Sequence, residues 1–224
     1  SYTSTFFNRG IAENEYGDYP AAIKDFSKVL KTDPTDAGAY CERGTAKRRM
    51  KNDKDALDDY TRAISLDSTQ ERYFYNRGLA YYDLANYEKA LTDFNRSLKL
   101  YPNNAIALTS VGLCYENMNE PKKAIDEFKL AIKVDPQHYS AYYSLGRLHN
   151  AIEDYASAKK YFIQAIAINA NDANAYIGKG NAEYGLKDYS AAETDYAKTV
   201  SLRPDYGAGY YNLGLAQYMR GEDY

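Results

Sequence analysis

The sequence predicts an all-α fold, built as a solenoid of repeated helix pairs, and three observations lead to this prediction. Apolar residues recur at the three-and-four spacing of amphipathic helices along the chain. Proline marks four of the six junctions between copies, at Pro34, Pro102, Pro136 and Pro204. Glycine recurs every 34 residues, at Gly10, Gly44, Gly78, Gly112, Gly146, Gly180 and Gly214. A strict period of this length indicates one structural unit that is copied and stacked.

Residues 71–104 show how one copy is built. Its first apolar stripe is Phe74, Tyr75, Gly78, Leu79 and Tyr82, and its second is Ala90, Leu91, Phe94, Leu98 and Leu100. We expect Asn86 to end the first helix and Tyr87 to open the second. Pro102 then ends the second helix, because proline cannot continue a helix and restricts the residue before it. Each copy is therefore predicted as helix, short turn, helix.

Three places in each copy, numbered 1 to 34 from residue 3, have a steric explanation. Place 8 holds the glycine, and place 20 holds Ala22, Ala56, Ala90, Ala124, Ala158 and Ala192. We expect the two helices of a copy to cross most closely at these two places, where nothing larger than a methyl group fits. Place 24 holds Phe26, Tyr60, Phe94, Phe128, Phe162 and Tyr196. We expect this ring to fill the space between one copy and the next.

This pattern resembles the tetratricopeptide repeat. The family's signature has a large residue at place 4, Leu-Gly at 7 and 8, Tyr at 11, Ala at 20, an aromatic ring at 24, Ala at 27 and Pro at 32. The resemblance covers the chain from Thr3 onward and implies a single elongated domain, a right-handed superhelix of antiparallel helix pairs. It divides the chain into six full repeats and the first helix of a seventh, at 3–36, 37–70, 71–104, 105–138, 139–172, 173–206 and 207–224.

Place 7 departs from the family's leucine in a way that predicts ion pairs. It is basic in four repeats, and in each of these four repeats place 23 on the second helix is aspartate. The predicted pairs are Arg9 with Asp25, Arg43 with Asp59, Arg77 with Asp93, and Lys179 with Asp195. We expect them to bridge the two helices of one repeat. The alternative is that both charges point to solvent.

Composition argues against several classes of function. The net charge is −3, and a nucleic-acid binder would show a basic excess. No apolar run is long enough to span a bilayer and no signal-peptide pattern follows Ser1, so we expect no membrane insertion. Cys41 and Cys114 occupy different places in different repeats, which favours two unpaired thiols in a reducing environment such as the cytoplasm.

The residues that enzymes use are sparse. The chain has 2 histidines, His138 at a junction and His149 at place 11, where we expect His149 to pack as a substitute for the usual tyrosine ring. No pair of carboxylates converges in a predicted cleft, and no glycine-rich phosphate loop is present. We therefore expect no catalytic residues, no cofactor and no metal.

The resemblance implies a concave groove lined by the first helix of each repeat. Tyrosine offers a rigid apolar face with a hydroxyl, and asparagine can bond a peptide backbone through its donor and its acceptor. The alternative is that these tyrosines only pack between first helices. The predicted groove residues are Phe7, Asn8, Arg48, Arg72, Tyr75, Asn76, Tyr82, Tyr143, Arg147, Tyr184, Tyr211 and Asn212.

Two observations on basic residues bear on the kind of partner: one basic cluster is present, and the basic clamp of chaperone-binding members is absent. Lys47, Arg48, Arg49 and Lys51 end the first helix of repeat 2, where cations complement the helix dipole. The sharper hypothesis is a landing site for an acidic segment, with Arg48 and Arg72 facing the groove. Chaperone-binding family members hold a C-terminal carboxylate with lysines, an arginine and asparagines at fixed places. No register of this chain supplies that basic constellation.

The sequence therefore predicts a non-catalytic scaffold that binds a protein client, as an extended peptide or a partner helix, in its concave groove. The alternative is the substrate-recognition arm of a larger enzyme. The seventh repeat stops at Tyr224 before its second helix, so we expect a fragment of a longer protein. We also expect that the uncapped helix at 207–224 could support self-association.

Overall fold

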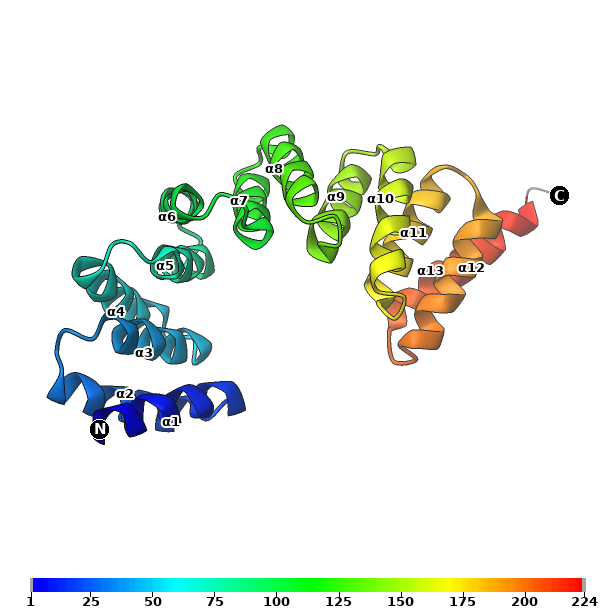
Figure 1. The fold of residues 1–224 in the computed structure, drawn as a ribbon. Coiled ribbons are helices and arrows are strands. Elements are labelled where there is room, and N and C mark those ends of the chain that lie inside the picture. Colours follow the sequence, from blue (N-terminus) through cyan, green and yellow to red (C-terminus); the bar gives the residue numbers. More distant parts are fainter. Residues whose placement is uncertain (1, 223–224) are drawn as a thin grey trace. The chain divides into compact units, whose positions relative to one another are not determined.

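The computed structural model describes the backbone of residues 2–222 and the side chains of residues 3–221. These residues form helices and no strand, so the predicted all-α class is confirmed (Figure 1). The helices are α1 (Tyr2–Tyr16), α2 (Tyr19–Thr32), α3 (Ala37–Arg49), α4 (Asp53–Leu66), α5 (Glu71–Asp83), α6 (Tyr87–Leu100), α7 (Ala105–Asn117), α8 (Pro121–Val134), α9 (Tyr139–Ala151), α10 (Tyr155–Ile168), α11 (Ala173–Gly185), α12 (Tyr189–Leu202) and α13 (Gly207–Glu222).

The chain divides into two compact units, Ser1–Glu120 and Pro121–Tyr224. The N-terminal unit contains α1 to α7, and the C-terminal unit contains α8 to α13. Within each unit the two helices of a repeat pack together, and the second helix packs on the first helix of the next repeat. The predicted helix pairs are therefore present in repeats 1, 2, 3, 5 and 6, whereas α7 and α8 of repeat 4 belong to different units. The single elongated domain stays a prediction.

Acidic and amide side chains begin most of the helices. Asp18, Asn86, Asp154 and Asp188, all at place 16, each accept a hydrogen bond from a backbone N–H in the first turn of the helix that follows. One boundary predicted from the sequence is wrong. The first helix of repeat 3 ends at Asp83, and Asn86 caps the second helix rather than closing the first.

Place 15 adopts a left-handed backbone in every repeat where the turn between the two helices is described. The φ angle is 84° at Gly17, 63° at Lys51, 56° at Ala85, 59° at Asn119, 60° at Glu153 and 63° at Lys187. Only the first of these is glycine, the residue that adopts this conformation without steric cost. The turn therefore imposes a backbone conformation that five of these side chains resist.

In repeats 1, 2, 3, 5 and 6 the ring at place 24 packs directly beneath the glycine at place 8 of the same repeat. A Cβ on Gly44 would lie 2.9 Å from the Tyr60 ring, and one on Gly78 would lie 2.7 Å from Phe94. The prediction that these glycines sit at a tight crossing is confirmed, but the ring occupies the space. The ring also reaches the next repeat as predicted, because a Cβ on Gly178 would collide with Phe162.

All four predicted ion pairs bridge the helices of one repeat. The nitrogen and oxygen atoms lie 2.8 Å apart in Arg9–Asp25, 2.7 Å in Arg43–Asp59, 2.7 Å in Arg77–Asp93 and 2.8 Å in Lys179–Asp195. The aspartates are 2–5% exposed. The hydrogen bonds from Arg9 hold the pKa of the Asp25 carboxyl below its usual range. The four carboxylates therefore belong to the core, whereas the Arg9 side chain is about half exposed.

His149 is buried, as its place predicted. Its ring lies 5.2 Å from the Tyr161 ring, centroid to centroid, and its Nδ1 lies 3.0 Å from Asp154 Oδ2. The histidine therefore packs as an aromatic residue inside repeat 5.

Candidate binding surface

The predicted groove residues lie on the first helices of the repeats, α1, α3, α5, α9, α11 and α13. Most of them either link neighbouring first helices or line cavities.

Two predicted cations of the N-terminal unit are paired with acids of the adjacent repeat. Arg48 Nη1 lies 2.8 Å from Asp83 Oδ2, and Arg72 Nη1 lies 2.8 Å from Glu42 Oε1. Lys47, from the same basic cluster, lies 2.7 Å from Asp59. An acidic partner segment would therefore have to displace these internal carboxylates.

Three other predicted residues of this unit also link first helices. The hydroxyl of Tyr75 lies 3.4 Å from Ser110 Oγ, and Asn76 Nδ2 donates to Cys41 Sγ at 3.4 Å. The hydroxyl of Tyr82 accepts from Asn117 Nδ2 at 2.9 Å. These contacts match the alternative in which groove residues pack between first helices.

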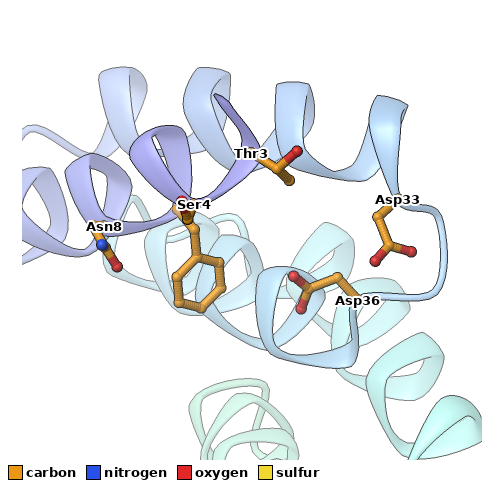
Figure 2. A pocket seen from close by; sticks show the side chains of 6 residues that line it. Thr3, Ser4, Asn8, Asp33 and Asp36 are labelled. Carbon is orange, nitrogen blue, oxygen red and sulfur yellow. The ribbon is translucent and has the colours of Figure 1, made fainter. Parts of the chain in front are cut away.

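Phe7 and Asn8 line a cavity of about 420 Å³ at the start of the N-terminal unit, shown in Figure 2. Its other lining residues are Thr3, Ser4, Asp33 and Asp36. Both carboxylates already accept hydrogen bonds. Asp36 caps Ala39 N at 2.8 Å, and Asp33 accepts from Thr35 N at 2.9 Å. The cavity is therefore acidic and polar, with one aromatic wall.

The C-terminal unit holds a cavity of about 460 Å³ between the first helices of three successive repeats, α9, α11 and α13. This cavity brings together three of the predicted residues, Arg147, Tyr184 and Asn212. Its remaining lining residues are Asn150, Ala151, Tyr155, Asn181, Tyr196 and Leu215. We call it the amide cavity, because three asparagines line it and no acidic residue does.

Hydrogen bonds fix the three asparagines of the amide cavity. Asn150 Nδ2 donates to the Gly178 carbonyl at 2.8 Å, and its Oδ1 is buried without a partner among the described residues. Asn181 Oδ1 accepts from the Tyr196 hydroxyl at 2.9 Å and from Asn212 Nδ2 at 3.3 Å. A chain of hydrogen bonds thus runs from the buried ring to the cavity wall.

A related cavity of about 540 Å³ lies between α1 and α3, in the N-terminal unit. There Asn14 donates to the Glu42 carbonyl at 3.2 Å, at the same places as Asn150 and Gly178. The hydroxyl of Tyr60 donates to Thr45 Oγ1 at 3.3 Å, at the same places as Tyr196 and Asn181. Glu15, Glu42 and Arg49 also line this cavity, which distinguishes its charge from that of the amide cavity.

The last two predicted residues, Tyr143 and Tyr211, line none of the three cavities. Tyr143 stacks on Tyr139 with ring centroids 5.9 Å apart and meets the edge of Phe162. Tyr211 on α13 is 72% exposed, and Tyr210 and Tyr218 on the same helix are also exposed.

The sequence did not predict two residues of the amide cavity, Asn181 and Tyr196. The signal that could have found them is the replacement of phenylalanine by tyrosine at place 24 in repeats 2 and 6.

The two cysteines lie inside the repeats. Cys41 and Cys114 are free and buried, and burial raises the pKa of each thiol to about 12. Within residues 2–222, no group of three His, Cys, Asp or Glu side chains is placed to hold a metal ion. No helix in the same range has the length and apolar character needed to cross a membrane.

Sequence profiles described as tetratricopeptide repeat match most of the chain. They cover residues 37–70, 72–104, 105–138, 139–172 and 177–223. Three of the matches, 37–70, 105–138 and 139–172, have the bounds of predicted repeats 2, 4 and 5, and the match at 177–223 runs across repeats 6 and 7. No curated protein sequence matches the chain.

Solved structures share the fold. The structure of PilW, a type IV pilus biogenesis factor, is similar over 96% of this chain and 98% of its own, with a TM-score of 0.84 and 19% identity. MamA covers 72% of this chain and 94% of its own, with a TM-score of 0.65 and 27% identity. YrrB, a TPR protein with an unusual peptide-binding site, covers 83% of this chain and 96% of its own at 19% identity and a TM-score of 0.65.

Proposed function

Because the chain belongs to the tetratricopeptide-repeat family, we propose that it is a non-catalytic scaffold that binds a protein client along its first helices. The observation that carries the proposal is the amide cavity, where Arg147, Tyr184 and Asn212 come together from three repeats. Phenol and carboxamide groups suit an adaptable peptide contact, because they combine apolar area with hydrogen bonding. YrrB, which shares the fold, is itself a peptide-binding protein.

Charge and burial favour the amide cavity over the other predicted positions. Arg48, Arg72, Tyr75, Asn76 and Tyr82 are already engaged by neighbouring first helices. Asn181 is exposed and Asn212 is half-buried, so a client can reach both. A client that contacts these two asparagines therefore displaces solvent, whereas a client at Arg48 or Arg72 must displace an internal carboxylate.

The proposal is tested by selecting peptides from a random displayed library on purified protein spanning residues 1–224. We expect the selected peptides to bind the wild type and to lose affinity for Asn212→Ala and Leu215→Asp, which alter the cavity wall. Asn171→Ala is the matched control, because Asn171 is an exposed asparagine outside the cavity. Peptides that bind all the variants equally well would place the client elsewhere, and failure to select any peptide would contradict the scaffold function.

Self-association through α13 is a second proposal, favoured by its three exposed tyrosines, Tyr210, Tyr211 and Tyr218. Sedimentation of the protein across a hundredfold concentration range tests it. We expect a dimer that weakens with Tyr211→Ser and Tyr218→Ser. A monomer at every concentration would contradict this proposal without affecting client binding.

A further inference from the structure

The first helix of repeat 7, α13, presents a face that the other described residues leave open. In repeats 1, 2, 3, 5 and 6 a ring of the second helix lies beneath the glycine at place 8, and each of these glycines is buried. Gly214 holds the same place in α13, but it is exposed, and a Cβ there would meet no heavy atom within 4 Å. Among residues 3–221, the space that receives a ring in five repeats is therefore open beside Gly214.

The exposed ring of Tyr211 belongs to the same face. Place 5 carries an aromatic ring in repeats 1, 3 and 5, and there it packs on the place-24 ring of its own repeat. The ring centroids are 5.7 Å apart in Phe7–Phe26, 5.5 Å in Tyr75–Phe94 and 5.9 Å in Tyr143–Phe162. Tyr211 stands at place 5 of repeat 7 and is 72% exposed. One additional ring would therefore contact both Tyr211 and Gly214, as a place-24 ring does in the other repeats.

The backbone at the end of α13 differs from that of the other first helices. In repeats 1, 2, 3, 5 and 6 place 15 is left-handed, with φ between 56° and 84°, and the second helix then packs on the first. In contrast, α13 continues as a helix through Gly221, at place 15, to Glu222. Arg220 Nη1 lies 2.5 Å from Glu193 Oε2 on α12 and stabilises this last turn. Residues 207–222 therefore lack the turn that reverses the chain, which favours a helix from another protein at this face.

Leu213, at place 7, specifies a further feature of that helix. Where place 7 is basic, place 23 is a buried aspartate that pairs with the cation. An aspartate set against Leu213 would lose its water without gaining a counter-charge, which is unfavourable. Repeat 5 has Leu145 at place 7, and there place 23 is Tyr161, directly before Phe162. The helix should therefore carry an uncharged residue immediately before its ring.

We propose that α13 binds an amphipathic α-helix of a partner protein, which inserts one aromatic ring between Gly214 and Tyr211. The partner helix carries alanine four residues before the ring, the spacing of places 20 and 24 in all six second helices of the chain. It would continue the alternation of first and second helices, because α12 already packs on α13. The site is separate from the amide cavity, to which α13 contributes Asn212 and Leu215. A second copy that covers Tyr211 would compete with the partner helix.

The test uses a peptide that copies residues 154–169, the sequence of α10, with blocked ends and a fluorescent label. This peptide has Ala158, Tyr161 and Phe162 at the required spacing. Fluorescence anisotropy measures its binding to protein spanning residues 1–224, at a concentration where sedimentation finds a monomer. We expect saturable binding that weakens about tenfold with Phe162→Ala in the peptide, because the ring is the buried anchor.

Variants of the protein locate the site. Gly214→Leu should weaken binding about tenfold, because its side chain fills the space for the ring. This variant should fold, since a Cβ at Gly214 meets no neighbouring atom and leucine favours a helix more than glycine does. The matched control is Ala208→Leu, which adds the same side chain at another exposed residue of α13 and should leave the affinity unchanged.

A charge exchange tests the register of the partner helix. Tyr161→Asp in the peptide should weaken binding to the wild type about tenfold, because its carboxylate would be buried against Leu213. The protein variant Leu213→Arg should reverse this preference, since it recreates the pairing of Arg77 with Asp93. Circular dichroism checks that each protein variant folds and that the peptides have similar helix content.

Three results would overturn the inference. The first is the absence of saturable binding, and the second is equal binding to the wild type, Gly214→Leu and Ala208→Leu. The third is a preference between the two peptides that Leu213→Arg does not change. A wild-type dimer that Gly214→Leu dissociates would assign this face to a second copy and would also overturn it. Client binding at the amide cavity stands or falls separately, because it is tested with Asn212→Ala and Leu215→Asp.

Discussion

Arg77 on α5 and Asp93 on α6 form a bidentate ion pair, with Nε–Oδ2 at 2.7 Å and Nη2–Oδ1 at 2.8 Å. The third nitrogen, Nη1, donates to Thr61 on α4 at 3.2 Å. One guanidinium thus connects both helices of repeat 3 and the second helix of repeat 2. Arg43 does the same with Asp59 and Ser27.

Removing only the arginine of this pair should lower the unfolding free energy more than replacing both residues. Arg77→Leu leaves Asp93, 3% exposed, without its counter-charge, and we expect a loss of about 3 kcal/mol in unfolding free energy. The double variant Arg77→Leu with Asp93→Tyr copies repeat 5, which has Leu145 and Tyr161 at these places, and should recover most of the loss. Urea unfolding followed by circular dichroism checks both. A double variant as unstable as the single one would show that the loss is not due to the unpaired charge.

Glycine at place 15 should stabilise the turn. Ala85 holds φ at 56°, a conformation that costs a residue with a side chain roughly 1 kcal/mol. We expect Ala85→Gly to raise the unfolding free energy by up to about 1 kcal/mol. Gly17→Ala is the reverse control, with φ at 84°, and should lower it. Thermal unfolding measures both, and a fall in Tm for Ala85→Gly would contradict the steric account.

Replacement of glycine by alanine at place 8 should have opposite effects on stability in repeats 3 and 7. A Cβ on Gly78 would lie 2.7 Å from the Phe94 ring, so Gly78→Ala should cost about 2 kcal/mol through overpacking. A Cβ on Gly214 has no heavy atom within 4 Å, and Gly214→Ala should gain about 0.8 kcal/mol from helix propensity. Comparison of the two Tm values checks the contrast. Equal losses would mean that helix geometry, not the ring, requires glycine.

Glu183 should make stability depend on pH. This carboxyl is 1% exposed, with Lys159 Nζ at 3.0 Å and Lys179 Nζ at 3.5 Å, and burial raises its pKa to about 7. The folded state holds the proton more tightly than the unfolded chain, whose pKa is near 4.5. The unfolding free energy should therefore fall as pH rises from 4.5 towards 7.

The variant Glu183→Gln removes this titration and should flatten the pH profile. We expect it to be more stable than the wild type at neutral and higher pH, by on the order of 1 kcal/mol. Glu88→Gln is the control, because Glu88 is exposed and should leave the slope unchanged. The measurement is Tm at several pH values. A wild-type Tm that rises across this range would reverse the predicted sign.

Several features of the fold follow from the sequence because they repeat. The glycine period defines the repeats, and the joint change of places 7 and 23 predicts all four ion pairs. The left-handed turn could not be predicted in this way. Place 15 holds Lys51, Ala85, Asn119 and Glu153 in different repeats, so no residue type marks the conformation that the backbone adopts there.

The candidate site was predicted only in part, because one of its residues, Tyr196, extends into it from the second helix of a repeat. Arg147, Tyr184 and Asn212 share the amide cavity, as their places on first helices suggest. The role of Tyr196 can be seen only in the structure, where its ring packs beneath Gly180 and its hydroxyl bonds Asn181. The pattern at place 24 marks a buried ring, and it gives no sign that the hydroxyl of Tyr196 bonds a residue of the cavity wall.

Place 12 connects neighbouring first helices in different ways along the N-terminal unit. Asn14 reaches a backbone carbonyl, Arg48 an aspartate and Tyr82 an asparagine. The repeats have the same outline, but the partner of the residue at place 12 differs between these junctions. Removal of residues 71–104 would keep the period intact and still set Arg48 against Asn117 in place of Asp83. The junction between repeats 2 and 3 therefore depends on which repeat follows, although the repeats share one length and one fold.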